Sequence, residues 1–206
     1  MLQRILHIML LLLALACLAA APVNGWLKMR PYAGLGLLQP GQPPFGQSSS
    51  ARRQIYRAPG VGRLTTLSAV SIPNHAMLFR ESEAGLPLIV SERRGDWLKV
   101  SYDDAGREGW VRLERRDTYQ TWPRFLVDRS GRLLSGLRQA MYQLYREPGG
   151  DPLEPFKAGE LFVVQAVSGD WLRVTAKTGR TGWLRWRDAD GRLLISVDLS
   201  SSPEKR

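Results

Sequence analysis

One turn-and-strand pattern occurs twice in this chain, and it constrains the fold more than any other feature. Its first copy is Gly-Asp-Trp-Leu-Lys-Val at 95–100, followed by Gly-Arg-Glu-Gly-Trp-Val-Arg at 106–112. Its second copy is Gly-Asp-Trp-Leu-Arg-Val at 169–174, followed by Gly-Arg-Thr-Gly-Trp-Leu-Arg at 179–185. Self-similarity of this kind is typical of a duplicated supersecondary unit. We therefore expect two copies of one small fold.

Within each copy the pattern predicts a β-hairpin. The run Trp-Leu-Lys-Val at 97–100 alternates, which places Trp and Lys on one face of a strand and Leu and Val on the other. The turn residues Asp-Asp-Ala-Gly at 103–106 then lead into the partner strand. Gly109 and Gly182 each precede a tryptophan, where a bent strand needs a residue without a Cβ.

The similarity extends beyond the hairpin on both sides. Residues 55–64 align without gaps to residues 144–153, and the first copy then carries extra residues at about 73–87, which predict an added hairpin in a long loop. A similar turn and strand follows each copy, at 128–134 and at 188–194. The chain's 20 glycines and 13 prolines favour turns and short strands over long helices. The sequence thus predicts an all-β protein.

The predicted organisation consists of two small domains joined by a short linker, with further segments at both ends. Its parts are a signal peptide (1–25), a flexible Pro/Gly/Ser-rich linker (26–53), domain 1 (54–115), a connector with a hairpin appendix (116–139), domain 2 (140–196) and a polar tail (197–206).

The N-terminal segment predicts export. Arg4 precedes an apolar run at 8–18, and small residues follow at 19–21, as in a cleaved signal peptide. A retained anchor helix is the alternative, although the apolar run is short for a membrane span. Ala-Leu-Ala-Cys at 14–17 also resembles a bacterial lipobox, so lipidation at Cys17 is a third possibility. All three place the domains outside the cytoplasm, either periplasmic or secreted, or anchored to the membrane through the N-terminus.

The repeated residues resemble the bacterial Src-homology-3-like (SH3b) domain. The features that carry the resemblance are Tyr-Arg-x-Pro-Gly at 56–60 and 145–149, a β-rich run, Gly-Asp-Trp-Leu-Lys/Arg-Val and Gly-x-x-Gly-Trp-Val/Leu. It covers roughly 54–114 and 141–195. The resemblance implies two tandem five-stranded, strongly bent barrels. It also implies an extracytoplasmic, non-catalytic module of the kind found beside cell-wall hydrolases, which binds peptidoglycan peptides or other proteins.

Four tryptophans in the hairpins divide into two expected roles. Trp97 and Trp171 begin a strand after an exposed turn, so they are candidates for stacking on a ligand, with half-buried packing against the neighbouring strand as the alternative. Trp110 and Trp183 follow the strand glycines, and we expect them to lie in the barrel core.

Two tyrosines and two aspartates complete the candidate ligand-binding set. Tyr56 and Tyr145 occupy matching positions near the long loop, where the eukaryotic relatives of the resembled family carry aromatic residues that line a groove for polyproline-type peptides. Asp96 and Asp170 lie in the turn before the strand. Their side chains are expected either to hydrogen-bond their own turn or to contact a ligand.

The sequence predicts no catalytic set, no metal site and no cofactor. Beyond Cys17 no cysteine remains, which excludes an intrachain disulfide and a Cys–His pair. His75 is the only histidine after the N-terminal segment, and its Ile-Pro-Asn context predicts a loop. Asp103 and Asp104 are neighbours in a turn, so they do not face one bond as an acid/base pair. Gly-Val-Gly at 60–62 lacks the flanking elements of a phosphate loop.

Charge points to an anionic partner. With 29 Lys and Arg against 19 Asp and Glu, the chain has a formal net charge of +10, which favours binding to cell-wall polymers, lipid headgroups or nucleic acid. Export argues against nucleic acid. The sequence therefore predicts a non-catalytic binding module of the bacterial cell envelope that recognises peptidoglycan or a peptide. The alternative is a periplasmic adaptor that binds a protein partner. The oligomeric state and the orientation of the two domains stay open.

Overall fold

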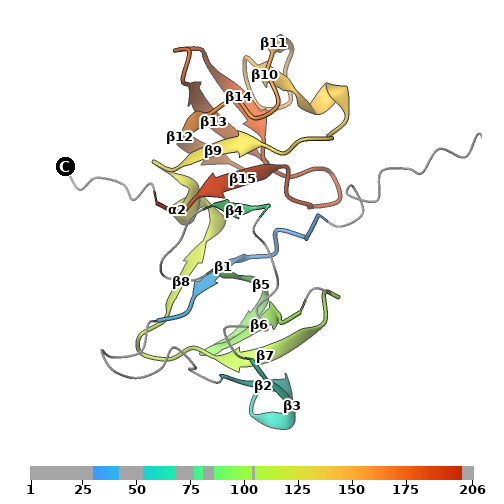
Figure 1. The fold of residues 1–206 in the computed structure, drawn as a ribbon, viewed down its shortest axis with the longest axis vertical. Coiled ribbons are helices and arrows are strands. Elements are labelled where there is room, and N and C mark those ends of the chain that lie inside the picture. Colours follow the sequence, from blue (N-terminus) through green and yellow to red (C-terminus); the bar gives the residue numbers. More distant parts are fainter. Residues whose placement is uncertain (1–29, 42–52, 68–76, 81–85, 104, 201–206) are drawn as a thin grey trace, which may run out of the picture. The chain divides into compact units, whose positions relative to one another are not determined.

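The computed structural model describes residues 30–41, 53–67, 77–80, 86–103 and 105–200 (Figure 1). The predicted signal peptide, His75 and most of the predicted polar tail lie outside these residues. The strands are β1 (Gly36–Gln39), β2 (Arg53–Ala58), β3 (Val61–Leu67), β4 (Phe79–Arg80), β5 (Leu88–Arg94), β6 (Trp97–Ser101), β7 (Glu108–Arg112), β8 (Thr118–Thr121), β9 (Ser130–Leu133), β10 (Gln143–Tyr145), β11 (Pro152–Pro155), β12 (Phe162–Ser168), β13 (Trp171–Ala176), β14 (Thr181–Arg185) and β15 (Ile195–Asp198). The described helices are the short α2 (Trp122–Leu126) and η3 (Gln139–Met141).

The strands form two sheets whose topologies match. The first has the order β3-β2-β7-β6-β5-β1-β8, and the second has the order β11-β10-β14-β13-β12-β9-β15, with β4 added at its end. Taken in chain order, seven strands therefore pair in the same way twice. We call residues 36–121 the first repeat and residues 130–198 the second repeat. Both belong to one compact unit, 31–206. The prediction of an all-β chain is confirmed.

Each repeat is longer than its predicted domain. Within the predicted linker, β1 pairs with β5 on one side and with β8 on the other, and its first three residues are buried. Within the predicted connector, β9 pairs in the same way with β12 and β15. At β1 the structure differs from the prediction because a four-residue buried strand between prolines and glycines shows no periodicity of its own, whereas β9 lies within the strand predicted at 128–134 and is confirmed. The partners of such a strand, rather than its own pattern, define it.

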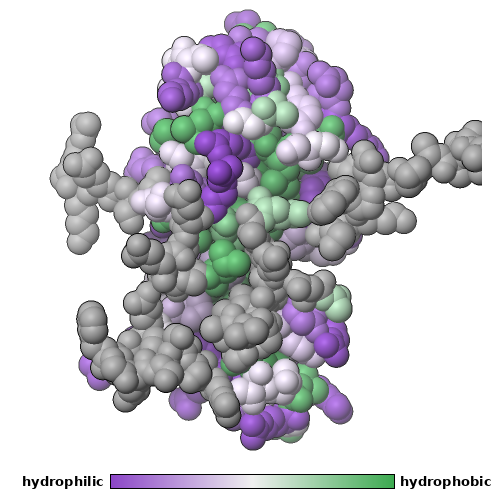
Figure 2. Space-filling model, in the orientation of Figure 1, coloured by the Kyte–Doolittle hydropathy of each residue, from purple (hydrophilic) through white to green (hydrophobic). Residues whose placement is uncertain are grey.

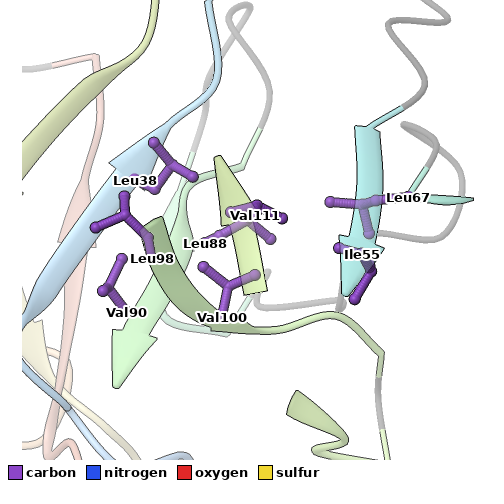
Figure 3. Packing of buried hydrophobic residues seen from close by; sticks show 8 residues of the cluster. All are labelled: Leu38, Ile55, Leu67, Leu88, Val90, Leu98, Val100 and Val111. Atoms are coloured by element: carbon purple, nitrogen blue, oxygen red, sulfur yellow. The ribbon is translucent and has the colours of Figure 1, made fainter. Parts of the chain in front are cut away.

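The hydrophobic core of the first repeat lies on one face of its sheet. Eight side chains from six strands form it, and Figure 3 shows them gathered between the strands. They are Leu38, Ile55, Leu67, Leu88, Val90, Leu98, Val100 and Val111. Because Leu98 and Val100 alternate with Trp97 and Lys99, the core-facing side chains are those that the alternation predicts.

The two repeats fill one core position in different ways. In the first repeat Leu38 of β1 lies opposite Leu88 of β5, whereas in the second repeat Gly131 of β9 lies opposite Phe162 of β12. A Cβ added at Gly131 would lie 3.0 Å from Cε2 of Phe162. The phenyl ring therefore occupies space that a leucine side chain occupies in the first repeat, and the pair conserves volume as close packing requires.

The strand glycines are needed because another strand crosses them. A Cβ added at Gly109 would lie 2.3 Å from Cγ2 of Ile55, and one added at Gly182 would lie 3.1 Å from Cδ2 of Leu144. Ile55 and Leu144 are fully buried on β2 and β10. The prediction that these positions exclude a Cβ is confirmed, more severely in the first repeat.

The extra residues of the first copy contribute to the second sheet. The described part of this segment contains β4, which pairs in parallel with β15: Phe79 lies opposite Val197 and Arg80 opposite Asp198. Most of the hairpin predicted at about 73–87 lies outside the described residues. The described Phe79 is buried, and its ring contacts Trp122 and Phe125 of α2. This inter-repeat aromatic cluster consists of Phe79, Trp122, Phe125 and Trp186, with ring centroids 5.4–6.4 Å apart.

A buried ion pair ties the ends of the first repeat together. The Asp117 carboxylate accepts two hydrogen bonds from the Arg53 guanidinium and one each from the backbone amides of Gly41 and Glu114. The Asp117 side chain is fully buried, and Arg53 is only 7% exposed. Burial alone would raise the pKa of Asp117, but the hydrogen bonds from Arg53 and the two amides outweigh it and hold that pKa below its usual value.

Candidate functional site

The strand register places two tryptophans and two cations together on the outer face of each sheet. In the first repeat Trp97 lies opposite Arg112, and Lys99 lies opposite Trp110. Residues two apart on a strand and directly opposite across a pair share one face. These four side chains therefore form a two-by-two pattern in which aromatic and cationic groups alternate, on the face away from the core. We call it the first aromatic block.

The second repeat has the same arrangement. Trp171 lies opposite Arg185, and Arg173 lies opposite Trp183. We call these four residues the second aromatic block. The Trp-x-Lys/Arg and Trp-x-Arg spacing of both copies contains this pattern, but sequence reasoning missed Arg112 and Arg185, because the relative register of the two strands decides whether the side chains meet.

A tyrosine extends each block by one strand. Tyr56 of β2 lies opposite Trp110, and its ring meets Trp97 edge-on at a centroid distance of 5.4 Å. In the second repeat, Tyr145 of β10 lies opposite Trp183, and its ring meets Trp171 at 4.9 Å. The structure thus brings together, in each repeat, a tyrosine and a tryptophan of the candidate ligand-binding set. Their role as ligand-binding residues stays a prediction.

The burial of the four tryptophans differs from the sequence prediction. Trp110 is only 4% exposed, but it lies on the outer face opposite Lys99 and not in the core cluster. Trp183 is half-buried rather than in the core, and Trp171 is 9% exposed rather than open. The more accessible tryptophan is therefore Trp97 in the first block and Trp183 in the second.

Guanidinium groups cover the buried tryptophans. Arg94 lies over Trp110 with its Cζ 4.9 Å from the ring centroid, and Arg185 lies over Trp171 at 4.8 Å. Such cation–π contacts hold the ring and the cation in one surface layer. A stacked guanidinium keeps its in-plane N–H donors, so it is still able to bind a carboxylate or phosphate.

The candidate aspartates behave differently in the two repeats. Asp96 is exposed, and its backbone carbonyl accepts a hydrogen bond from the Leu113 amide. The Asp170 carboxylate pairs with Arg187, and its backbone carbonyl accepts from Trp186. Of the two expectations, a bond within the turn or contact with a ligand, the first differs from the structure at Asp170, whose carboxylate pairs with Arg187 just beyond β14.

The two blocks differ in how their cations are neutralised. Lys99 pairs with Glu108 at 3.2 Å, and Arg94 pairs with Glu92 at 2.7 Å, so carboxylates hold two cations of the first repeat's outer face. Within the part of the chain that the structure describes, no carboxylate forms an ion pair with Arg173 or Arg185 of the second block, or with Arg112 of the first. The second block therefore presents two guanidinium groups without a counter-charge beside its tryptophans, and the first block presents one.

Two other charged groups are used structurally. In the β6–β7 turn, the Arg107 backbone amide and side chain both donate to Asp103, and these bonds hold the pKa of that carboxyl below its usual value. In the second repeat, Arg180 pairs with Glu160 at 2.6 Å and with Glu154 at 3.2 Å. Burial raises the pKa of Glu160, but the hydrogen bonds from Arg180, the Lys157 amide and Thr178 outweigh burial, so the pKa is lowered.

Among the described residues, no group of three or more His, Cys, Asp or Glu side chains is arranged to hold a metal ion. None of the helices in that part of the chain is long and apolar enough to cross a membrane. Compared with known proteins, the chain matches no family model, and no curated protein sequence matches it. The geometry of the two aromatic blocks is therefore the basis for a functional proposal.

Proposed function

We propose that the chain is a non-catalytic binding module of the bacterial cell envelope. In this proposal each repeat contains an SH3-like barrel, and the aromatic blocks recognise peptidoglycan or an extended peptide. The observation that carries it is the Tyr-Trp-Trp group with two flanking cations on an outer sheet face, present at matching positions of both repeats. Trp110 and Trp171 are buried on that face, whereas Trp97 and Trp183 are only half-buried, which leaves part of each ring open to a ligand.

Three further features support the proposal. Aromatic rings beside cationic groups suit ligands that combine an apolar face, such as a sugar ring or proline, with a carboxylate or phosphate. Two equivalent blocks on one chain allow bivalent attachment to a polymer, which raises avidity without new contacts. The N-terminal sequence favours export to the compartment where such polymers lie.

The experiment is co-sedimentation of the purified chain with isolated peptidoglycan sacculi. We expect wild-type protein to sediment with the sacculi at physiological salt, and Trp97→Ala together with Trp183→Ala to reduce the bound fraction at least fivefold. Val61→Ala is the matched control, because Val61 is an apolar side chain that is 67% exposed and lies outside both blocks. Circular dichroism checks that each variant is folded. Sedimentation no greater than for the protein alone would refute wall binding.

The alternative is an adaptor that binds a protein of the envelope. Crosslinking and affinity capture from envelope extracts separate the two functions. A single stoichiometric protein partner whose capture depends on Trp97 and Trp183, without sacculus binding, favours the adaptor.

A further inference from the structure

The two aromatic blocks share their rings but differ in the charges around them. Two residues before the tryptophan of β7 the first repeat has Glu108, and at the equivalent position of β14 the second repeat has Thr181. Directly opposite Lys99 the first repeat has Glu92 on β5, whereas directly opposite Arg173 the second repeat has Ala166 on β12. Both carboxylates of the first repeat are thus absent from the second.

This difference decides which cations are available. Lys99 is bound to Glu108, so an incoming anion must compete with a carboxylate already in place. Arg173 occupies in the second block the position that Lys99 occupies in the first, and it is exposed. Its neighbours are Thr181 and Ala166, where Lys99 has Glu108 and Glu92. Its guanidinium also provides a planar pair of donors that an ammonium lacks.

The neighbours of Arg173 complete a site. Trp183 lies directly opposite it and is half-buried, which leaves ring surface at the outer face. Diagonally across the block, the Arg185 guanidinium lies over the Trp171 ring, a contact that does not use its in-plane N–H donors. Two guanidinium groups therefore flank an accessible ring. In Figure 2, hydrophilic residues make up much of the surface over the strands of the second repeat, and apolar residues are exposed between them.

We infer that the second aromatic block is a site for an anionic carbohydrate polymer. The sugar ring stacks on Trp183, and its carboxylate or phosphate binds Arg173 and Arg185. The first block then contacts the same polymer with less charge, because Glu108 neutralises Lys99 and leaves Arg112 as its one cation without an ion pair among the described residues. This inference rests on the proposed function and assigns its charge recognition chiefly to the second repeat. Charge complementarity selects the occupant: an apolar peptide would gain nothing from two unneutralised arginines.

The test exchanges the deciding residue between the repeats. Thr181→Glu gives the second block the acid of the first, and Glu108→Thr removes that acid from the first block. The probe is an alginate oligosaccharide, a polymer of uronic acids, and its affinity for the purified full chain is measured by calorimetry. Maltohexaose is the uncharged sugar control, and linear polyphosphate is the anion without a ring.

We expect Thr181→Glu to weaken alginate binding about tenfold or more, the order of one lost charge-assisted hydrogen bond. Glu108→Thr should strengthen binding by freeing Lys99, and maltohexaose should bind far more weakly than alginate. Both substitutions lie at exposed strand positions, and thermal denaturation checks that they leave the fold unchanged.

Three results would overturn the inference. The first is an affinity for alginate that neither substitution changes. The second is an affinity for maltohexaose equal to that for alginate. The third is polyphosphate binding that is as tight, and as sensitive to Thr181→Glu, as alginate binding, because that result assigns the site to anions without a sugar. Each of these leaves sacculus co-sedimentation untouched. A failure of the sacculus experiment with normal alginate binding would instead refute the proposed function alone.

Discussion

Replacing Asp117 tests whether the buried ion pair holds the first repeat together. Its carboxylate is fully buried and accepts four hydrogen bonds, two of them from Arg53, which is itself almost completely buried. Asp117→Asn leaves the buried Arg53 charge with only the exposed Glu114 carboxylate, 3.9 Å away, as a counter-charge. Removing one partner of such a pair costs about 3–5 kcal/mol of unfolding free energy. For a unit of this size, that corresponds to a fall in Tm of roughly 6–20 °C.

The second repeat provides the comparison. By strand register, Tyr142 and Ile195 occupy the positions of Arg53 and Asp117, so the same topology accepts uncharged residues there. We expect the double variant Arg53→Met/Asp117→Leu to lose less stability than Asp117→Asn alone, because no charge remains buried. The Gly41 amide is half-buried and Glu114 is exposed, so water is able to replace their lost acceptor.

The assay is urea unfolding followed by tryptophan fluorescence, with the midpoint compared at unchanged m. The pKa of Asp117 is lowered in the folded state. Its contribution to the unfolding free energy is therefore present above the unfolded pKa of about 3.9 and is lost as pH falls through the folded pKa. The difference in unfolding free energy between wild type and Asp117→Asn should therefore become smaller in strong acid. A loss below about 1 kcal/mol at pH 7, or a double variant as unstable as the single one, would refute this account.

Two further predictions concern packing and pH. Gly109→Ala should destabilise the protein by about 1–3 kcal/mol, since the new Cβ would lie 2.3 Å from Cγ2 of Ile55. Gly182→Ala should cost less, because its new Cβ would lie 3.1 Å from Cδ2 of Leu144. Equal losses of unfolding free energy for the two variants in urea would contradict the geometry. Glu160→Gln should lower the unfolding free energy at pH 7 but much less near pH 3. The reason is that the pKa of Glu160 is lowered in the folded state, so the contribution of its charge disappears as pH falls through that pKa. A loss of unfolding free energy that does not depend on pH in the same assay would instead assign the effect to packing.

Much of the fold could be predicted because it depends on local patterns that occur twice. The alternation at 97–100 and the glycine before each second tryptophan determine the hairpins, and both are visible in the sequence. The strand β1 could not be predicted in the same way, because it is only four residues long and its identity depends on pairing with β5 and β8. The strand β9 lies within the turn and strand predicted at 128–134, but its pairing with β12 and β15 could not be predicted from that local pattern.

The candidate site was predicted in part for a related reason. The meeting of Tyr56 with Trp97 follows from their position in the repeated unit, but the burial of Trp110 and Trp171 depends on which arginine lies over each ring. Arg94 is the last residue of β5 and Arg185 is the last residue of β14, so the two covering arginines come from non-equivalent strands although the two copies look alike in sequence. Equivalent motifs therefore produced rings with unequal exposure.

The pairing of β4 with β15 bears on whether either repeat is an independent folding unit. In tandem-repeat proteins, stability is approximately the sum of the intrinsic stability of each repeat and of the interfaces between neighbours. Here a segment from within the first repeat completes the edge of the second repeat's sheet, and its phenylalanine packs with Trp122 and Phe125. Excising the first repeat would therefore remove an edge strand from the second and expose aromatic surface, so we expect the two repeats to unfold together.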